Sequence, residues 1–168
     1  MPSINGYNVG NIFNSFQTTT SASTTSTSLV TLGTIFLPAN TFVLGNVVRT
    51  YGLFDKLNAN NGYDVRFYWN TTNDLTGSPV LFGVFSATTV TAGSYGLYRK
   101  IFINGTSGTQ SYGYPTSVTT FGNDLNESTT ALEVFTINWT VDSYIIAAAR
   151  VLSASDIMNF RYMRVAVG

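Results

Sequence analysis

The chain has 168 residues and carries eight basic and eight acidic side chains, so its formal net charge is zero. It contains neither Cys nor His, which excludes disulfide frameworks, thiolate and zinc-finger sites, cysteine nucleophiles and Ser-His-Asp triads. Eight scattered basic residues also argue against a nucleic-acid binder, which needs a basic face to neutralise phosphates. We therefore expect no catalytic residue, no metal and no cofactor, and we expect that the protein is not an enzyme.

Charged residues make up only 10% of the chain, whereas a typical soluble domain has roughly 25%. Ser, Thr and Asn together supply about a third of the sequence, which predicts a neutral, hydrogen-bonding surface. Such a surface suits a protein that packs against copies of itself or against a shell, because unpaired charges are costly to desolvate. A monomeric β-rich domain with a Thr-rich exterior is the alternative.

Targeting signals are not evident. Residues 1–10 have neither a basic start nor an apolar stretch, so we expect no secretory signal and synthesis in the host cytoplasm. The longest apolar run, Tyr144–Ala149, is far shorter than the roughly 20 residues that a membrane span needs. We therefore expect no membrane partner.

The first 28 residues differ from the rest of the chain. Residues 1–17 are rich in Asn and Gly, and their apolar residues match neither a strand period nor a helical one, which predicts an extended arm. The hydroxyl-rich tract Thr18–Ser28 predicts a linker or a solvated edge strand. A disordered terminus is the alternative for the arm. We expect that the arm docks on a partner through its apolar residues, which are Ile4, Tyr7, Val9, Ile12, Phe13 and Phe16.

From residue 29 to residue 168, strand patterns alternate with turn signals, and the dipeptide Asn61-Gly62 predicts a hairpin loop with positive φ values. About eight or nine short strands and no helix predict an all-β fold, an antiparallel, jelly-roll-like β-sandwich with an extended N-terminal arm. The predicted strands are Leu29–Leu37, Asn46–Lys56, Tyr63–Asn70, Pro79–Ser86, Ser94–Asn104, Ser117–Phe121, Glu133–Thr140, Ser143–Leu152 and Ile157–Val167.

Alternation within two of these strands predicts which side chains face the core. In the strand 63–70, one face is expected to be core and the other wet. The predicted core residues are Tyr63, Val65, Phe67 and Trp69, and the predicted wet residues are Asp64, Arg66, Tyr68 and Asn70. In the segment 133–141, one side is expected to carry Phe135, Ile137, Trp139 and Val141.

Two polar groups are candidates for chemistry. Asp55 and Asp64 flank the predicted hairpin and could meet across the ladder as a carboxylate pair, but Lys56 and Arg66 beside them favour solvated ion pairs. The loop residues Asn73, Asp74 and Thr76 could hold calcium through their oxygens. They contribute only one carboxylate, and an Asx-turn explains the same composition.

Aromatic residues gather in the second half of the chain, where Tyr95, Tyr98 and Tyr162 accompany the loop Asn104–Pro115. That loop is expected to be flexible, and its tip carries Tyr112 and Tyr114. Tyr rings on loops commonly recognise a partner or a sugar, so we interpret this loop as a possible recognition loop for a host surface glycan. A packed crossover with both rings folded inward is the alternative.

Three segments together resemble a known protein family. They are Ile35–Phe42 followed by Gly45–Arg49, Trp69-Asn70-Thr71 before Leu75–Ser78, and Ile137–Asp142 before Tyr144-Ile145-Ile146. In order and pattern they are similar to jelly-roll structural proteins of tailed bacteriophages, which are found as capsid decoration modules or at tail-fibre ends. The resemblance spans about residues 29–167 and implies a homotrimeric β-sandwich with no catalytic residues to carry over.

This resemblance leads to an expected function. We expect a non-catalytic virion surface protein, a capsid decoration or cement protein that assembles with itself and binds the major capsid protein or another virion protein through its arm. The short region before the body favours a free-standing subunit over a fibre tip. The alternative is a receptor-binding, glycan-binding tail-fibre tip that uses Tyr112 and Tyr114. A third hypothesis is a polysaccharide-degrading enzyme that acts through Asp55 and Asp64.

Overall fold

The computed structural model describes residues 3–4, 7–8, 14–18, 22–58, 61–88, 92–105, 111–113 and 133–167. Every regular element within these ranges is a β-strand. The strands are β1 (Ser3–Ile4), β2 (Tyr7–Asn8), β3 (Asn14–Thr18), β4 (Ser23–Thr24), β5 (Val30–Leu37), β6 (Val47–Leu57), β7 (Tyr63–Asn70), β8 (Val80–Ala87), β9 (Gly93–Ile103), β10 (Ser111–Gly113), β11 (Glu133–Phe135), β12 (Ser143–Val151) and β13 (Ile157–Val167).

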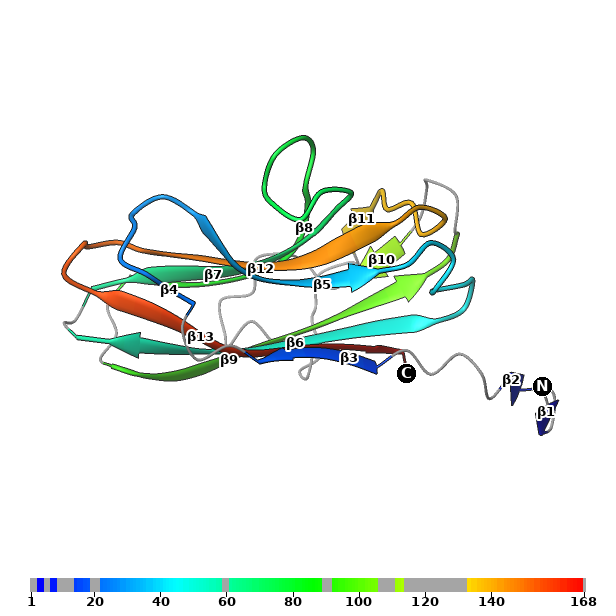
Figure 1. The fold of residues 1–168 in the computed structure, drawn as a ribbon, viewed down its shortest axis with the longest axis horizontal. Coiled ribbons are helices and arrows are strands. Elements are labelled where there is room, and N and C mark those ends of the chain that lie inside the picture. Colours follow the sequence, from blue (N-terminus) through cyan, green and yellow to red (C-terminus); the bar gives the residue numbers. More distant parts are fainter. Residues whose placement is uncertain are drawn as a thin grey trace.

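Two antiparallel sheets face each other and form a sandwich (Figure 1). The larger, seven-stranded sheet has the order β11-β10-β9-β6-β13-β3, and β4 also pairs with β13. The smaller sheet has the order β5-β12-β7-β8. β1 and β2 pair only with each other in a separate two-stranded sheet, which Figure 1 draws away from the sandwich. The predicted all-β antiparallel sandwich is thus confirmed.

The hydrophobic core lies between the two sheets and follows the alternation of their strands. Phe54 and Phe160, in register on β6 and β13, are fully buried, and their ring centres are 5.5 Å apart. From the smaller sheet, Phe67 stacks on Phe82 at 5.9 Å. As predicted, Tyr63, Val65, Phe67 and Trp69 all face this core.

The predicted hairpin at Asn61-Gly62 is wrong, because β6 and β7 belong to different sheets. The chain therefore passes from one layer to the other between Leu57, the last residue of β6, and Tyr63, the first residue of β7. Asn58 has a φ of 71°, and the described glycines with positive φ are Gly45 and Gly77. Gly62 serves a different purpose. A Cβ there would lie 2.2 Å from the backbone oxygen of Ala87, so only glycine allows the crossing chain to approach β8 this closely.

The predicted wet face of β7 is also wrong. Asp64, Tyr68 and Asn70 are 5%, 8% and 3% exposed. Tyr68 packs with Ile146 and Ala148 of β12 on the outer side of the smaller sheet. Side chains that cover this second cluster are Leu29, Leu75, Leu81 and Tyr144. An antiparallel sheet usually leaves one face to water, but here segments before β5 and after β7 cover it.

Two further segments differ from expectation. The predicted strand 133–140 ends at Phe135, and the chain then turns, with the backbone N–H and the hydroxyl of Thr140 both donating to the Asn138 side chain. Phe135, Ile137 and Trp139 are buried as predicted, but Val141 is 36% exposed. Within the predicted loop 104–115, residues 111–113 form β10. The predicted strand 117–121 lies outside the described residues.

Four strands, β1 to β4, occur within the predicted arm and linker, residues 1–28. β3 and β4 both pair with β13 and extend the larger sheet. The N-terminal segment therefore contributes to the sandwich from residue 14 onward, and its boundary with the body at residue 28 stays a prediction.

A β-bulge in β13 decides which of its side chains face outward. Phe160 is in register with Phe54 and Tyr162 with Leu53, so Arg161 is an extra residue in the ladder. Before the bulge Met158 and Phe160 are buried, and after it Met163 and Val165 are. A ladder without this bulge would turn the later even-numbered residues, Arg164 among them, into the core.

Candidate functional site

A groove of about 250 Å³ lies over the central strands β9, β6 and β13 of the larger sheet. It opens on the outer face, because the residues that alternate with its lining point into the core. Two arginines and two tyrosines contribute to its wall, and none of the described residues that line it is acidic. We call it the Arg/Tyr groove. Its lining residues are Arg49, Tyr51, Tyr98, Arg164, Ala166 and Val167.

Strand register arranges the groove's aromatic rings and one of its cations in a row. Tyr98 of β9 is opposite Tyr51 of β6, and Tyr51 is opposite Arg164 of β13. Gly96 makes room for this row, because a Cβ there would lie 3.3 Å from the Tyr51 ring. The Tyr51 ring also lies 6.1 Å, between centres, from the ring of Tyr162. The row therefore consists of two tyrosines followed by an arginine.

The neighbouring row on the same face places two cations opposite each other. Lys100 of β9 is opposite Arg49 of β6, and Arg49 is opposite Ala166 of β13. Like charges in direct register weaken a sheet. The Lys100 ammonium lies 5.7 Å from the centre of the Tyr98 ring, a contact that offsets part of this repulsion. Ala166 is small, and so the groove stays open beside Arg49.

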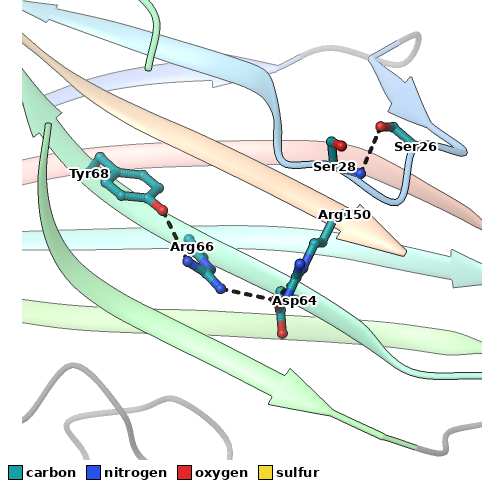
Figure 2. Close-up of polar contacts among 6 residues, drawn as sticks. All are labelled: Ser26, Ser28, Asp64, Arg66, Tyr68 and Arg150. Carbon is teal, nitrogen blue, oxygen red and sulfur yellow. Dashed lines mark hydrogen bonds and ion pairs between the residues drawn. The ribbon is translucent and has the colours of Figure 1, made fainter. Parts of the chain in front are cut away.

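On the opposite side of the sandwich, two arginines converge on one carboxylate (Figure 2). Asp64 Oδ2 accepts hydrogen bonds from Arg150 Nε at 2.6 Å and from Arg66 Nη2 at 3.1 Å. Arg66 also donates to the Tyr68 hydroxyl. Burial raises the pKa of Asp64, but hydrogen bonds from Ser86, Arg150 and Arg66 outweigh burial and hold that pKa below its ordinary value. The group ties β7 to β12, and we interpret it as structural.

The structure separates the two carboxylates that were considered as a catalytic pair. Asp55 is on the larger sheet, where it accepts hydrogen bonds from Ser94 and Arg161, whereas Asp64 is on the smaller one. Burial raises the pKa of Asp55, but these two hydrogen bonds outweigh it and keep the pKa below its ordinary value. The predicted meeting of the two carboxylates across one ladder is therefore wrong. Arg66 does pair with Asp64, as expected, but the pair is half-buried.

Lys56 pairs with Asp156 instead of forming a solvated pair. Its Nζ lies 3.3 Å from Asp156 Oδ2, and both side chains are fully buried. A second buried cation, Arg99, lies between the sheets and donates from Nε to the backbone oxygen of Phe82 at 3.1 Å. The absence of a side chain at Gly83 makes room for it, because a Cβ there would lie 2.6 Å from Arg99 Cγ.

The loop considered for calcium is held by its own hydrogen bonds. Asp74 Oδ1 accepts from the Thr76 backbone N–H, the Thr76 hydroxyl and the Thr72 hydroxyl. These bonds, with the Thr76 hydroxyl first, lower the pKa of Asp74. Asn70 donates to the backbone oxygens of Asp74 and Thr76. The network is an Asx-turn. Within the described ranges, no three Asp, Glu, His or Cys side chains gather in a way that could hold a metal.

Only some of the predicted arm and loop residues are described. Phe16 lies on β3 opposite Arg164, and Ile4 and Tyr7 pair in the small separate sheet. Val9, Ile12, Phe13 and Tyr114 lie outside the described residues. Tyr112 lies on β10, opposite Phe102 of β9 and Val134 of β11.

The Arg/Tyr groove was not predicted from the sequence. The alternating pairs Arg49 and Tyr51, and Tyr98 and Lys100, do mark one polar-aromatic face on each strand. Of the aromatic residues that were singled out, Tyr98 lines the groove, while Tyr95 packs inward at 4.9 Å from Tyr63. Only the strand order β9-β6-β13 brings the groove together, and alternation within one strand does not reveal that order.

The chain matches no protein-family model, no curated protein and no solved structure. Across the described part of the chain, no helix has the length and apolarity to cross a membrane.

Proposed function

We propose that the protein is a non-catalytic virion surface protein, a decoration or cement subunit that assembles as an oligomer, with a homotrimer as the expected form. Its N-terminal arm would bind the capsid shell. The observation that carries this proposal is the path of the arm. β3 pairs with β13 at the edge of the larger sheet, while β1 and β2 pair with each other apart from the sandwich (Figure 1).

The arm and the body would have separate roles. The sandwich would supply the body of the subunit. Five of the six predicted anchoring side chains lie before β3, and no residue before β3 is charged. Each of the five would contribute roughly 1.5–3 kcal/mol if fully buried in a shell protein. In an oligomer, several such arms would bind together, and their avidity would exceed the affinity of one arm.

A deletion tests the arm, and β3 determines where that deletion should end. Removing residues 1–17 would take away most of β3, so the test removes residues 1–13 and keeps Asn14–Thr18. We expect the shortened chain to fold and to assemble like the full chain but to lose co-sedimentation with capsid shells that lack the decoration protein. Undiminished co-sedimentation would rule out the arm as the anchor.

Point variants in the full-length chain provide the matched comparison. One variant changes the apolar residues Ile4, Tyr7, Val9, Ile12 and Phe13 to Ser, and the other changes the interspersed Asn5, Asn8 and Asn11 to Ser. Shell binding should be lost in the first variant and kept in the second. Equal loss in both would mean that the backbone or length of the arm is recognised and not its apolar side chains.

The second candidate function is a receptor-binding tail-fibre tip. It is favoured by the position of Tyr112 on β10, in the same sheet as β9 and the Arg/Tyr groove. Changing Tyr112 and Tyr114 to Ala should then abolish attachment to host cells while oligomerisation persists. Normal attachment of that double variant would argue against this candidate.

A further inference from the structure

We propose that the Arg/Tyr groove is a binding site for a carboxylate-bearing saccharide, such as a chain of uronic acids. This inference goes beyond capsid binding, because the groove lies over the middle strands of the larger sheet and the described residues that line it all belong to β6, β9 and β13. A decoration protein with such a site would hold the particle to acidic polysaccharide.

The aromatic row suits a sugar ring. Tyr51 and Tyr98 lie side by side in register on β6 and β9. Tyrosine combines a broad apolar ring with a polar hydroxyl, so it can cover the C–H face of a sugar and still bond its hydroxyl groups. The groove's volume of about 250 Å³ is below the range of about 300–1,000 Å³ for pockets that enclose drug-sized ligands. It would therefore hold about one ring of a longer chain.

The cations supply a preference for carboxylate. Arg49 and Arg164 line the groove from neighbouring strands, and Lys100 lies opposite Arg49. A guanidinium can bond both oxygens of a carboxylate at once. Arg49 and Lys100 lie opposite each other in register and place two positive charges side by side on this face. The charges of the groove therefore complement an acidic sugar better than a neutral one.

The same features disfavour nucleic acid as the occupant. Non-specific binding to DNA or RNA depends on many phosphate contacts along a track, whereas this groove has two arginines in its lining and one lysine beside it. On the same sheet, Arg161 is already bound to Asp55. A short, locally basic groove with two tyrosines fits a sugar that carries a single carboxylate on each ring.

The test is calorimetric titration of the full-length chain with oligogalacturonate. The matched ligand is the fully methyl-esterified oligomer, which keeps the ring but lacks the charge. We expect the acidic oligomer to bind at least about tenfold more tightly than its ester, the gain that one charge-assisted hydrogen bond of about 1.4 kcal/mol gives. Binding should weaken as the salt concentration rises, because the site is solvent-exposed.

Variants locate the site. Arg49→Gln and Arg164→Gln should each weaken binding of the acidic oligomer about tenfold. Tyr51→Ala should weaken binding of the acidic oligomer and binding of its ester to the same extent. The matched control is Arg150→Gln, which removes the same charge from the opposite sheet and should leave binding unchanged. Circular dichroism of each variant establishes that the sandwich is intact.

Several results would overturn the proposal. They are a failure of both oligomers to bind, equal affinity for the acid and its ester, or an Arg150→Gln variant that weakens binding as much as the Arg49→Gln variant does. Displacement of the oligomer by an equimolar amount of inorganic phosphate would identify a simple anion site instead of a saccharide site. None of these results depends on capsid shells. The saccharide proposal can therefore fail while the arm still binds its shell, and the arm can fail to bind its shell while the groove still binds the saccharide.

Discussion

At the scale of single residues, two opposite charges inside the sandwich compensate each other. Lys56 and Asp156 are both fully buried and 3.3 Å apart, and removing one partner would leave the other charge without compensation in the core. We expect Lys56→Met to lower the free energy of unfolding by about 3–5 kcal/mol. The double variant Lys56→Met, Asp156→Leu should recover most of this loss, since two apolar side chains replace the pair. Urea denaturation of both variants measures this, and equal destabilisation would contradict it.

Asp64 gives stability a pH dependence. Its pKa in the folded chain is lowered, because the hydrogen bonds of Ser86 and the two arginines outweigh burial. A carboxyl of this kind stabilises the fold at pH values above its ordinary pKa of 3.8. That contribution is lost as the pH falls through the lower pKa that the group has in the folded chain. Asp64→Asn should therefore cost about 1–3 kcal/mol at pH 7 and little in strong acid. Thermal unfolding at both pH values checks this, and an equal cost at both would exclude the charge as the cause.

At the scale of elements, the passage from β6 to β7 depends on close contact at Gly62. A Cβ there would meet the Ala87 backbone oxygen at 2.2 Å, whereas one at Gly77 would meet nothing within 4 Å. Gly77→Ala should cost about 1 kcal/mol, the strain of its positive φ. Gly62→Ala should cost about 3 kcal/mol, because backbone must move. Chemical denaturation of the two variants compares them, and a larger cost at Gly77 would contradict this view of the crossing.

The elements also explain how far the sequence predicted the fold. Alternation identified the core face of β7. Tyr63, Val65 and Phe67 occupy every second position, and every second side chain of a strand faces the inner side of its sheet. It failed for Tyr68 on the other face, because the cover comes from Leu29 and Leu75 on segments outside the strand. Such cover is a tertiary property, and no local pattern reports it.

The candidate site was less predictable for a related reason. Each strand showed its polar-aromatic alternation, but the groove needs β9, β6 and β13 in that order. β6 precedes a strand of the other sheet in sequence, so chain order suggested a hairpin where the structure has a crossing. The burial of Arg99 was not predicted for the same reason, because the space that admits it lies beside Gly83 on β8, a different strand from its own.

At the scale of the whole molecule, the proposed oligomer has a candidate contact at one end of the sandwich. Leu44 is 64% exposed and Val141 is 36% exposed. Their loops are joined by hydrogen bonds from Ala39 to Asp142 and from Asn40 to Trp139. Burying such apolar surface between copies would favour assembly.

We expect sedimentation equilibrium to give about 55 kDa, three times the chain mass of 18.2 kDa, and we expect Leu44→Ser to raise the monomer fraction. Leu152→Ser is the matched control, since Leu152 is 47% exposed and follows the other end of β12. A monomer at all concentrations would exclude the trimer, and an equal effect of both variants would exclude this contact.

The bulge at Arg161 also bears on how the chain can change in length. Phe160 and Tyr162 pair with the successive residues Phe54 and Leu53 of β6. Arg161, between them, is therefore an extra residue in the ladder of β13. A chain that lost this residue would keep every other pair and the same faces, and would give up only the contact with Asp55. A deletion away from the bulge, for example of Asn159 or Val165, would exchange inner and outer side chains over part of the strand. We therefore expect natural variation in the length of this strand to be confined to the bulge.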